Sequence, residues 1–69
     1  MNNDLPPERF IIGNSDDCEA EYGLRDEAPV TVLEFYEGDV VCVYGFATIA
    51  AAKADLIDGG AVAAQISYL

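Results

Sequence analysis

The clearest pattern along the chain is an alternation of side chains on either side of a turn. Residues 30–36 and residues 40–44 are rich in β-branched and aromatic side chains, and Glu37-Gly38-Asp39 lies between them. This pattern predicts a β-hairpin closed by a two-residue loop, either Glu37-Gly38 or Gly38-Asp39.

The length of that loop decides which hairpin residues face the core. Cross-strand partners share a face, so a two-residue loop predicts a core face that holds Leu33, Phe35, Val40, Cys42 and Tyr44. Cys42 is then a small core residue. A three-residue loop would instead set Val32 opposite Tyr44, and the pattern leaves both registers open.

The chain before the hairpin divides into a tail and a first strand. Residues 1–8 contain the Pro6-Pro7 pair, which blocks a helix, and they predict a flexible N-terminal tail. The apolar run of residues 9–13 ends at a glycine and predicts a strand. A chain of 69 residues accommodates one domain, which we expect to span residues 9–69.

Residues 16–24 fit two different structures. Alternation over residues 18–25 favours a half-buried strand, because Ala20, Tyr22 and Leu24 would share one face. Asp16 followed three residues later by Glu19, with a glycine at position 23, also fits a short helix. We prefer the strand and keep the helix as the alternative.

The period changes after Phe46. Thr48 is a suitable N-cap for a helix, and apolar residues then recur at helical spacing until Gly59-Gly60 ends it. Residues 62–68 alternate again and predict a last strand. The sum is an α+β domain of about β-β-β-β-α-β, a small, mainly antiparallel sheet with one helix packed on one face.

One face of that sheet would remain open. Its expected occupants are Val32, Glu34, Tyr36, Val41 and Val43. An exposed apolar and aromatic set of this kind, interrupted by one carboxylate, usually marks a surface for a partner or for self-association.

The charge balance adds a second argument. The chain holds thirteen acidic side chains against three basic ones, a formal net charge of -10. Residues 1–39 hold eleven acids against two arginines, a net of -9, whereas residues 40–69 hold two acids against one lysine, a net of -1. Such a chain is repelled by nucleic-acid phosphates and by anionic membranes, so a basic protein is the expected partner.

The residue types disfavour catalysis and bound groups. There is no histidine, so Ser-His and Cys-His nucleophiles are excluded, and we expect no enzyme and no cofactor. Asn14, Asp16 and Cys18 fall at alternate positions, but the loop lacks the glycine and the final glutamate of a calcium hand, so no metal site is expected. The N-terminus lacks the features of a signal peptide, which predicts a cytoplasmic protein with reduced thiols.

In its size, acidity, lack of catalytic residues and single-domain α+β plan, the chain resembles the small phage-encoded anti-defence proteins, which include anti-CRISPR proteins and DNA mimics. The resemblance is one of class and carries no residue correspondence. It implies a stoichiometric inhibitor that occupies a nucleic-acid-binding or recruitment surface of a defence complex in a bacterial host cell, such as a CRISPR effector.

We therefore expect a non-enzymatic acidic protein that docks on a basic, nucleic-acid-handling partner. The residues expected to bind are Glu34, Tyr36, Glu37 and Asp39 on the hairpin and Asp16, Asp17, Glu19 and Glu21 before it. Two alternatives remain: a homodimeric assembly or regulatory subunit that pairs through the open sheet face, and an antitoxin- or immunity-type partner of a basic protein.

Overall fold

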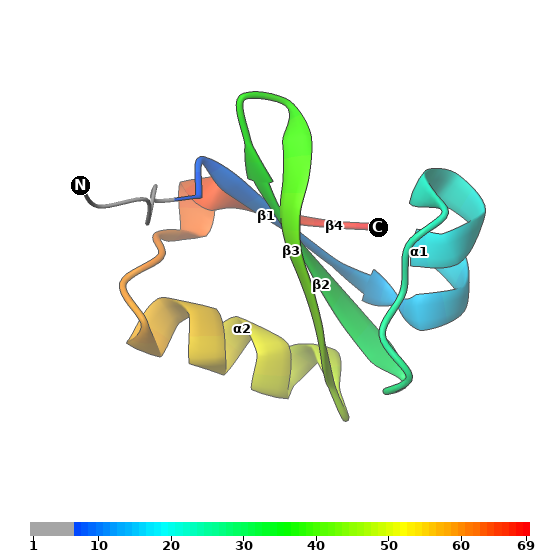
Figure 1. Cartoon of the computed structure of the whole chain (residues 1–69). Coiled ribbons are helices and arrows are strands. Elements are labelled where there is room, and N and C mark those ends of the chain that lie inside the picture. The colour runs from blue at the N-terminus through cyan, green and yellow to red at the C-terminus, as the bar shows by residue number, and fades with distance from the viewer. Residues whose placement is uncertain (1–6) are drawn as a thin grey trace.

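A computed structural model describes residues 7–69 as one sheet with a helix on each face (Figure 1). The elements in chain order are β1 (Arg9–Asn14), α1 (Ser15–Tyr22), β2 (Val30–Tyr36), β3 (Asp39–Phe46), α2 (Ile49–Asp58), a short 3-10 helix (Ala63–Gln65) and β4 (Ile66–Tyr68). The predicted α+β class is confirmed. Residues 1–6 of the predicted tail lie outside the described residues.

The sheet has the strand order β3-β2-β1-β4. β1 pairs antiparallel with β2, and β2 pairs antiparallel with β3, whereas β4 runs parallel to β1. The last strand is shorter than predicted because the 3-10 helix takes up residues 63–65. Long β3 and short β4 are therefore the two edges of the sheet.

The preferred strand over residues 18–25 is wrong, and the helical alternative is the correct one. α1 ends at Gly23, which adopts a left-handed φ of 72° and donates its N–H to Glu19 O at 2.8 Å. The acidic pair Asp16 and Asp17 lies in the first turn, where the helix dipole favours negative charge. The helix buries Ser15 and Cys18, and the alternating residues that favoured a strand stay exposed.

The hairpin closes through a two-residue turn. Glu37 and Gly38 have φ values of 52° and 85°, the signature of a type I′ turn, so the Glu37-Gly38 alternative is confirmed. Phe35 pairs with Val40, but Glu34 pairs with Cys42, which leaves Val41 as an extra residue in a β-bulge. The bulge shifts the register by one residue.

This shift corrects the predicted faces of β3. Beyond the bulge Val32 pairs with Tyr44 and Leu33 with Val43, so Cys42 and Tyr44 lie on the face opposite Leu33. Cys42 is exposed and is not the small core residue that was predicted. A side-chain period of two makes any one-residue shift exchange the two faces.

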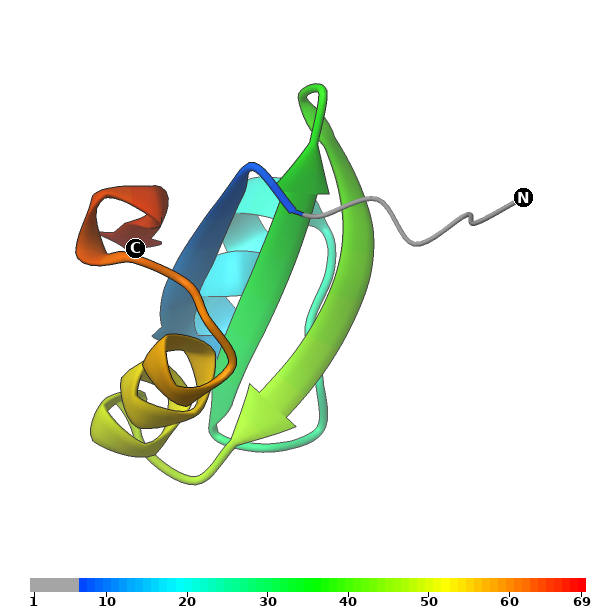
Figure 2. The same cartoon turned by 90° about the vertical axis from the view of Figure 1, so that its left-hand side faces the viewer.

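Both faces of the sheet are covered, so the predicted open face does not exist in this form. Figures 1 and 2 place α2 and α1 on opposite faces. On the α2 side the buried core consists of Phe10, Ile12, Val30, Val32, Ala52, Leu56 and Ile66. On the α1 side it consists of Ile11, Cys18, Leu33 and Phe35. Val32, predicted on the open face, is fully buried.

A buried polar network holds the segment between α1 and β2 in place. The Thr31 hydroxyl accepts the N–H of Asp26 at 2.9 Å and lies 2.6 Å from the Ser15 hydroxyl, which donates to Ala28 O. The Asp26 carboxylate accepts the N–H of Ala28 at 2.9 Å. This carboxylate lies over Gly45 of β3, where an added Cβ would overlap it, so the segment also covers part of β3.

α2 begins and ends as its sequence predicts. Thr48 caps the helix by accepting the N–H of Ala51 at 3.1 Å, and Gly60 supplies a φ of 108° just beyond the last turn. Ala52 and Leu56 face the sheet and are buried, whereas Ile49 and Ile57 are exposed.

Candidate partner-binding surface

The first group of acidic residues lies at the end of the hairpin. Glu37 occupies the turn, Asp39 begins β3, and both are exposed. The Glu8 carboxylate accepts the N–H of Glu37 at 2.9 Å, while the N–H of Glu8 donates to Phe35 O at 2.8 Å. Glu8, Glu37 and Asp39 therefore form one set, the hairpin-tip cluster.

The sequence places Glu8 in the predicted tail and does not indicate it as a site residue. It lies 29 residues from Glu37, and no local pattern connects the two. The neighbouring cation does not neutralise the cluster by an ion pair, because the guanidinium of Arg9 lies over the Phe35 ring at 4.3 Å and both ion pairs found in residues 7–69 belong to Arg25.

Two other predicted hairpin residues, Glu34 and Tyr36, are less exposed than Glu37 and Asp39. Glu34 is half-buried on the α2 side of the sheet, where it accepts a hydrogen bond from the Tyr44 hydroxyl. Burial and this hydrogen bond raise the pKa of Tyr44 above its ordinary value, so the hydroxyl is a stable donor. Tyr36 ends β2 opposite Asp39 and is half-buried.

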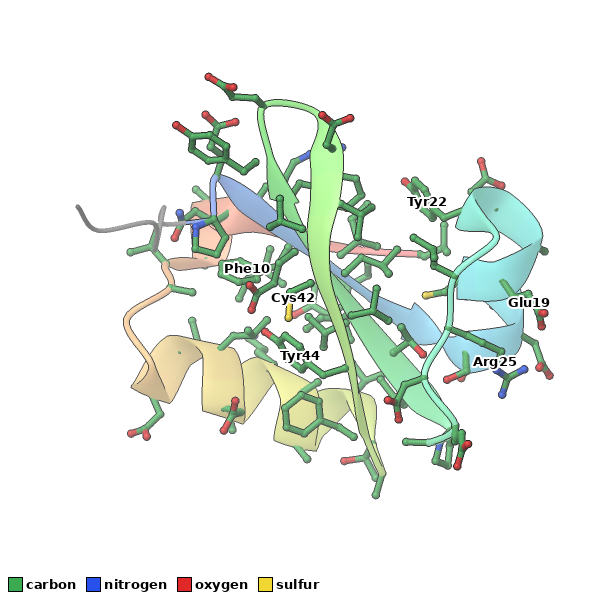
Figure 3. The ribbon with its side chains drawn as sticks, viewed as in Figure 1. Phe10, Glu19, Tyr22, Arg25, Cys42 and Tyr44 are labelled. Atoms are coloured by element: carbon green, nitrogen blue, oxygen red, sulfur yellow. The ribbon has the colours of Figure 1, made fainter. Side chains whose placement is uncertain are left out.

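The second group lies on α1. Asp16, Asp17, Glu19 and Glu21 are all exposed, as expected of a solvated helix. Arg25 binds Asp16 and lies 3.5 Å from a carboxylate oxygen of Glu19 (Figure 3). Asp17 and Glu21 take part in neither of these ion pairs, so α1 keeps a net negative charge.

The structure separates the two predicted groups. The hairpin tip and α1 are different elements that project from the sheet in different directions (Figure 1). A partner with one basic surface would meet one group at a time unless its surface is broad or curved.

A shallow depression that the sequence did not indicate lies between the sheet and the end of α2. It has a volume of about 300 Å³ and is lined by Pro7, Phe10, Glu34, Tyr44, Asp55, Leu56, Gly59 and Ala61. Figure 3 shows Tyr44 on the side of the sheet that faces α2. The depression combines an apolar floor with two carboxylates, and only the register shift at Val41 brings Tyr44 to it.

The two thiols occupy different environments. Cys18 is fully buried with its Sγ 3.9 Å from Thr31 O, and burial, aided by the charge of Asp17, raises its thiol pKa. Cys42 is exposed on β3, and neither cysteine is in a disulfide. In the part of the chain that the structure describes, no group of three or more His, Cys, Asp or Glu residues could hold a metal ion.

Comparison with known proteins yields no relative: no family model matches the chain, and neither a curated protein nor a solved structure matches it. Among residues 7–69, no helix has both the length and the apolar character needed to cross a membrane.

Proposed function

We propose that this protein is a non-enzymatic inhibitor that binds a basic, nucleic-acid-handling partner through exposed carboxylates. The observation that carries the proposal is the charge left without a partner. Twelve of the thirteen acidic side chains lie in residues 7–69, all except Asp4, and ion pairs there engage only Asp16 and Glu19. Clustered carboxylates present a negative field that speeds association with a basic surface.

The side chains that could do chemistry support a role in binding. The buried Cys18 thiol has a raised pKa and is a poor nucleophile. The raised pKa of Tyr44 keeps its hydroxyl protonated, and Lys53 is exposed on α2. With no histidine in the chain, Ser-His and Cys-His nucleophile pairs are absent.

The class of partner follows from size and charge. The chain is small, acidic and α+β, as are the phage-encoded anti-defence proteins that it resembles. On this proposal it acts in the cytoplasm of a bacterial host, where it occupies the nucleic-acid-binding or recruitment surface of a defence complex. A carboxylate cluster there competes with phosphates for the same basic side chains.

The test is a pull-down with the tagged protein from bacterial lysate, comparing two charge-matched variants. Glu37→Lys/Asp39→Lys reverses the hairpin tip, and Asp55→Lys/Asp58→Lys makes the same change in charge on α2. All four residues are exposed, so the circular dichroism spectra should match that of the wild type. We expect only the tip variant to lose the partner. If the carboxylates are desolvated on binding, the binding free energy should weaken by about 2–5 kcal/mol.

Salt supplies a second readout. Exposed charges are screened over roughly 10 Å at 0.1 M and 3 Å at 1 M salt, so capture should fall in high salt. Equal capture by both variants, or capture that resists 1 M salt, would contradict the proposal. Recovery of a basic toxin would keep the mode of binding and change the partner to that of an immunity-type protein.

A further inference from the structure

The outer edge of β3 is the longest stretch of unpaired strand in the described chain. β3 runs over Asp39–Phe46 at the end of the strand order, and β2 is its only strand partner within residues 7–69. An edge strand presents a row of backbone N–H and C=O groups that another extended chain can pair with. The bulge at Val41 bends the strand near the tip, so the regular stretch is residues 42–46.

This edge lacks most of the devices that usually protect a strand from pairing. Residues 40–46 contain no proline and no charged residue, and the Val41 side chain is 56% exposed. Short length, lysine and proline are common protections of an edge and are absent from residues 40–46. Two others are present: the bulge at Val41, and the Asp26 carboxylate, which lies over Gly45. The other edge, β4, has three residues and offers little backbone to pair with.

Charge decides which kind of chain fits this edge. Residues 26–52 hold five acids, Asp26, Glu27, Glu34, Glu37 and Asp39, and no lysine or arginine. A second copy would bring the same carboxylates to the same edge, which disfavours self-pairing. A segment with basic side chains is complementary to it.

Cys42 marks the position on β3 at which a side chain of an added strand could reach Glu34. It pairs with Glu34 on the next strand, it is small and exposed, and it lies on the α2 side of the sheet. A residue that pairs with Cys42 from outside would have its Cα two strand spacings, about 10 Å, from that of Glu34. A lysine or arginine side chain can cover that distance over the small cysteine. The Glu34 carboxylate has acceptor sites to spare, because Tyr44 uses one of them.

We infer that β3 accepts an extended basic segment of the partner as a fifth strand, with a lysine or arginine opposite Cys42 that reaches Glu34. The inference rests on the proposed function, since it assumes a basic partner. It adds the mode of recognition: backbone pairing along residues 42–46 supplies the contact, and the Glu34 carboxylate selects a cationic side chain at one position.

The probe is a blocked nine-residue peptide in which lysine alternates with valine, titrated into ¹⁵N-labelled protein. We expect amide shifts and slower amide exchange along residues 42–46. The same peptide with N-methylated amides keeps its charges but loses its backbone donors, and it should bind at least about tenfold more weakly. If both peptides bind equally, or if the shifts fall only on α1 and the hairpin tip, strand addition is refuted.

Two variants test the place of the cation. Cys42→Lys puts a positive charge beside Glu34 and should weaken binding of the lysine peptide about tenfold. Val62→Lys adds the same charge at an exposed site outside the sheet and should not weaken it. Cys42→Ser should bind as the wild type does. Glu34→Gln should weaken binding of the lysine-valine peptide and leave binding of a glutamine-valine peptide unchanged. Equal effects on both peptides would show that Glu34 does not select the cationic side chain.

The experiment separates this inference from the proposed function. Lysate capture that depends on Glu37 and Asp39, together with no response of residues 42–46 to the peptide, overturns strand addition alone. If lysate capture does not depend on Glu37 and Asp39, the proposed function is overturned even if the peptide binds. A dimer of the free protein that Cys42→Lys dissociates, measured by sedimentation, would show that the edge pairs with a second copy and would overturn the inference.

Discussion

Replacing Thr31 by valine tests whether the buried polar network stabilises the fold. Thr31 is fully buried, and its hydroxyl accepts from Asp26 N at 2.9 Å and contacts Ser15 Oγ at 2.6 Å. Valine has nearly the same shape, so Thr31→Val removes the hydroxyl without opening a cavity. The Asp26 N–H is left without its acceptor, while Ser15 still donates to Ala28 O. Leaving this part-buried donor without its acceptor costs about 1–3 kcal/mol.

That cost is a large fraction of the total free energy of unfolding expected for a chain of this size. At about 0.05–0.15 kcal/mol per residue, 69 residues give a free energy of unfolding of roughly 3–10 kcal/mol. Urea unfolding followed by circular dichroism is the assay, with an m value near 1 kcal/mol/M expected at this length. The midpoint should fall by about 1–3 M, and the melting temperature by about 4–8 °C for each kcal/mol lost.

A double-mutant cycle with Ser15→Ala isolates the contact between the two hydroxyls. The double variant should lose less stability than the sum of the single variants, by about 0.5 kcal/mol or more. Ser67→Ala on β4 is the surface control and should stay within about 0.5 kcal/mol of the wild type. An unchanged midpoint and m value for Thr31→Val would refute the role of the network.

Three further predictions concern the turn, the thiols and alkaline pH. Glu37→Asn should raise the free energy of unfolding by about 0.5–1 kcal/mol in urea titrations, because asparagine tolerates the positive φ of a type I′ turn better than glutamate does. Cys42 should react with a thiol reagent at once and Cys18 only on unfolding, and equal rates in the folded protein would contradict the burial of Cys18. Because the pKa of Tyr44 is raised in the fold, the unfolded chain loses that proton first, so stability should fall as the pH rises beyond about 10. Tyr44→Phe should flatten this fall, and an identical pH profile in both proteins would refute it.

The candidate site was predictable only where its position depends on the local chain. Glu37 and Asp39 flank a turn that the sequence shows, and turns lie at the surface, so their exposure follows directly. The α1 carboxylates are exposed in the helix, and the predicted strand would also have exposed them, with Asp16 and Asp17 in a loop and Glu19 and Glu21 on the outer face. Glu34 is different, because the face to which it points and its hydrogen bond to Tyr44 depend on pairing between strands.

The contacts of Glu8 also could not be predicted from the local sequence. Two adjacent prolines precede it and predict an irregular tail, and nothing in that stretch predicts pairing. Its N–H nevertheless extends the pairing of β1 with β2, and its carboxylate binds the hairpin turn. Such contacts join residues far apart in sequence, so no local pattern reports them.

By itself the sequence determined the elements whose signals are local. Dihedral preferences place a turn within residues 37–39 and the end of α2, although only the structure shows that Glu37-Gly38 forms the turn. The Thr48 side chain caps α2 by accepting the N–H of Ala51, three residues later, and the excess of carboxylates is a matter of counting. Only the tertiary structure decided the faces of β3, the helix over residues 15–22 and the parallel pairing of β4 with β1. Each of these depends on the apolar surface and the backbone groups that segments distant in sequence bury together. The free energy of those contacts cannot be read from a short stretch of sequence.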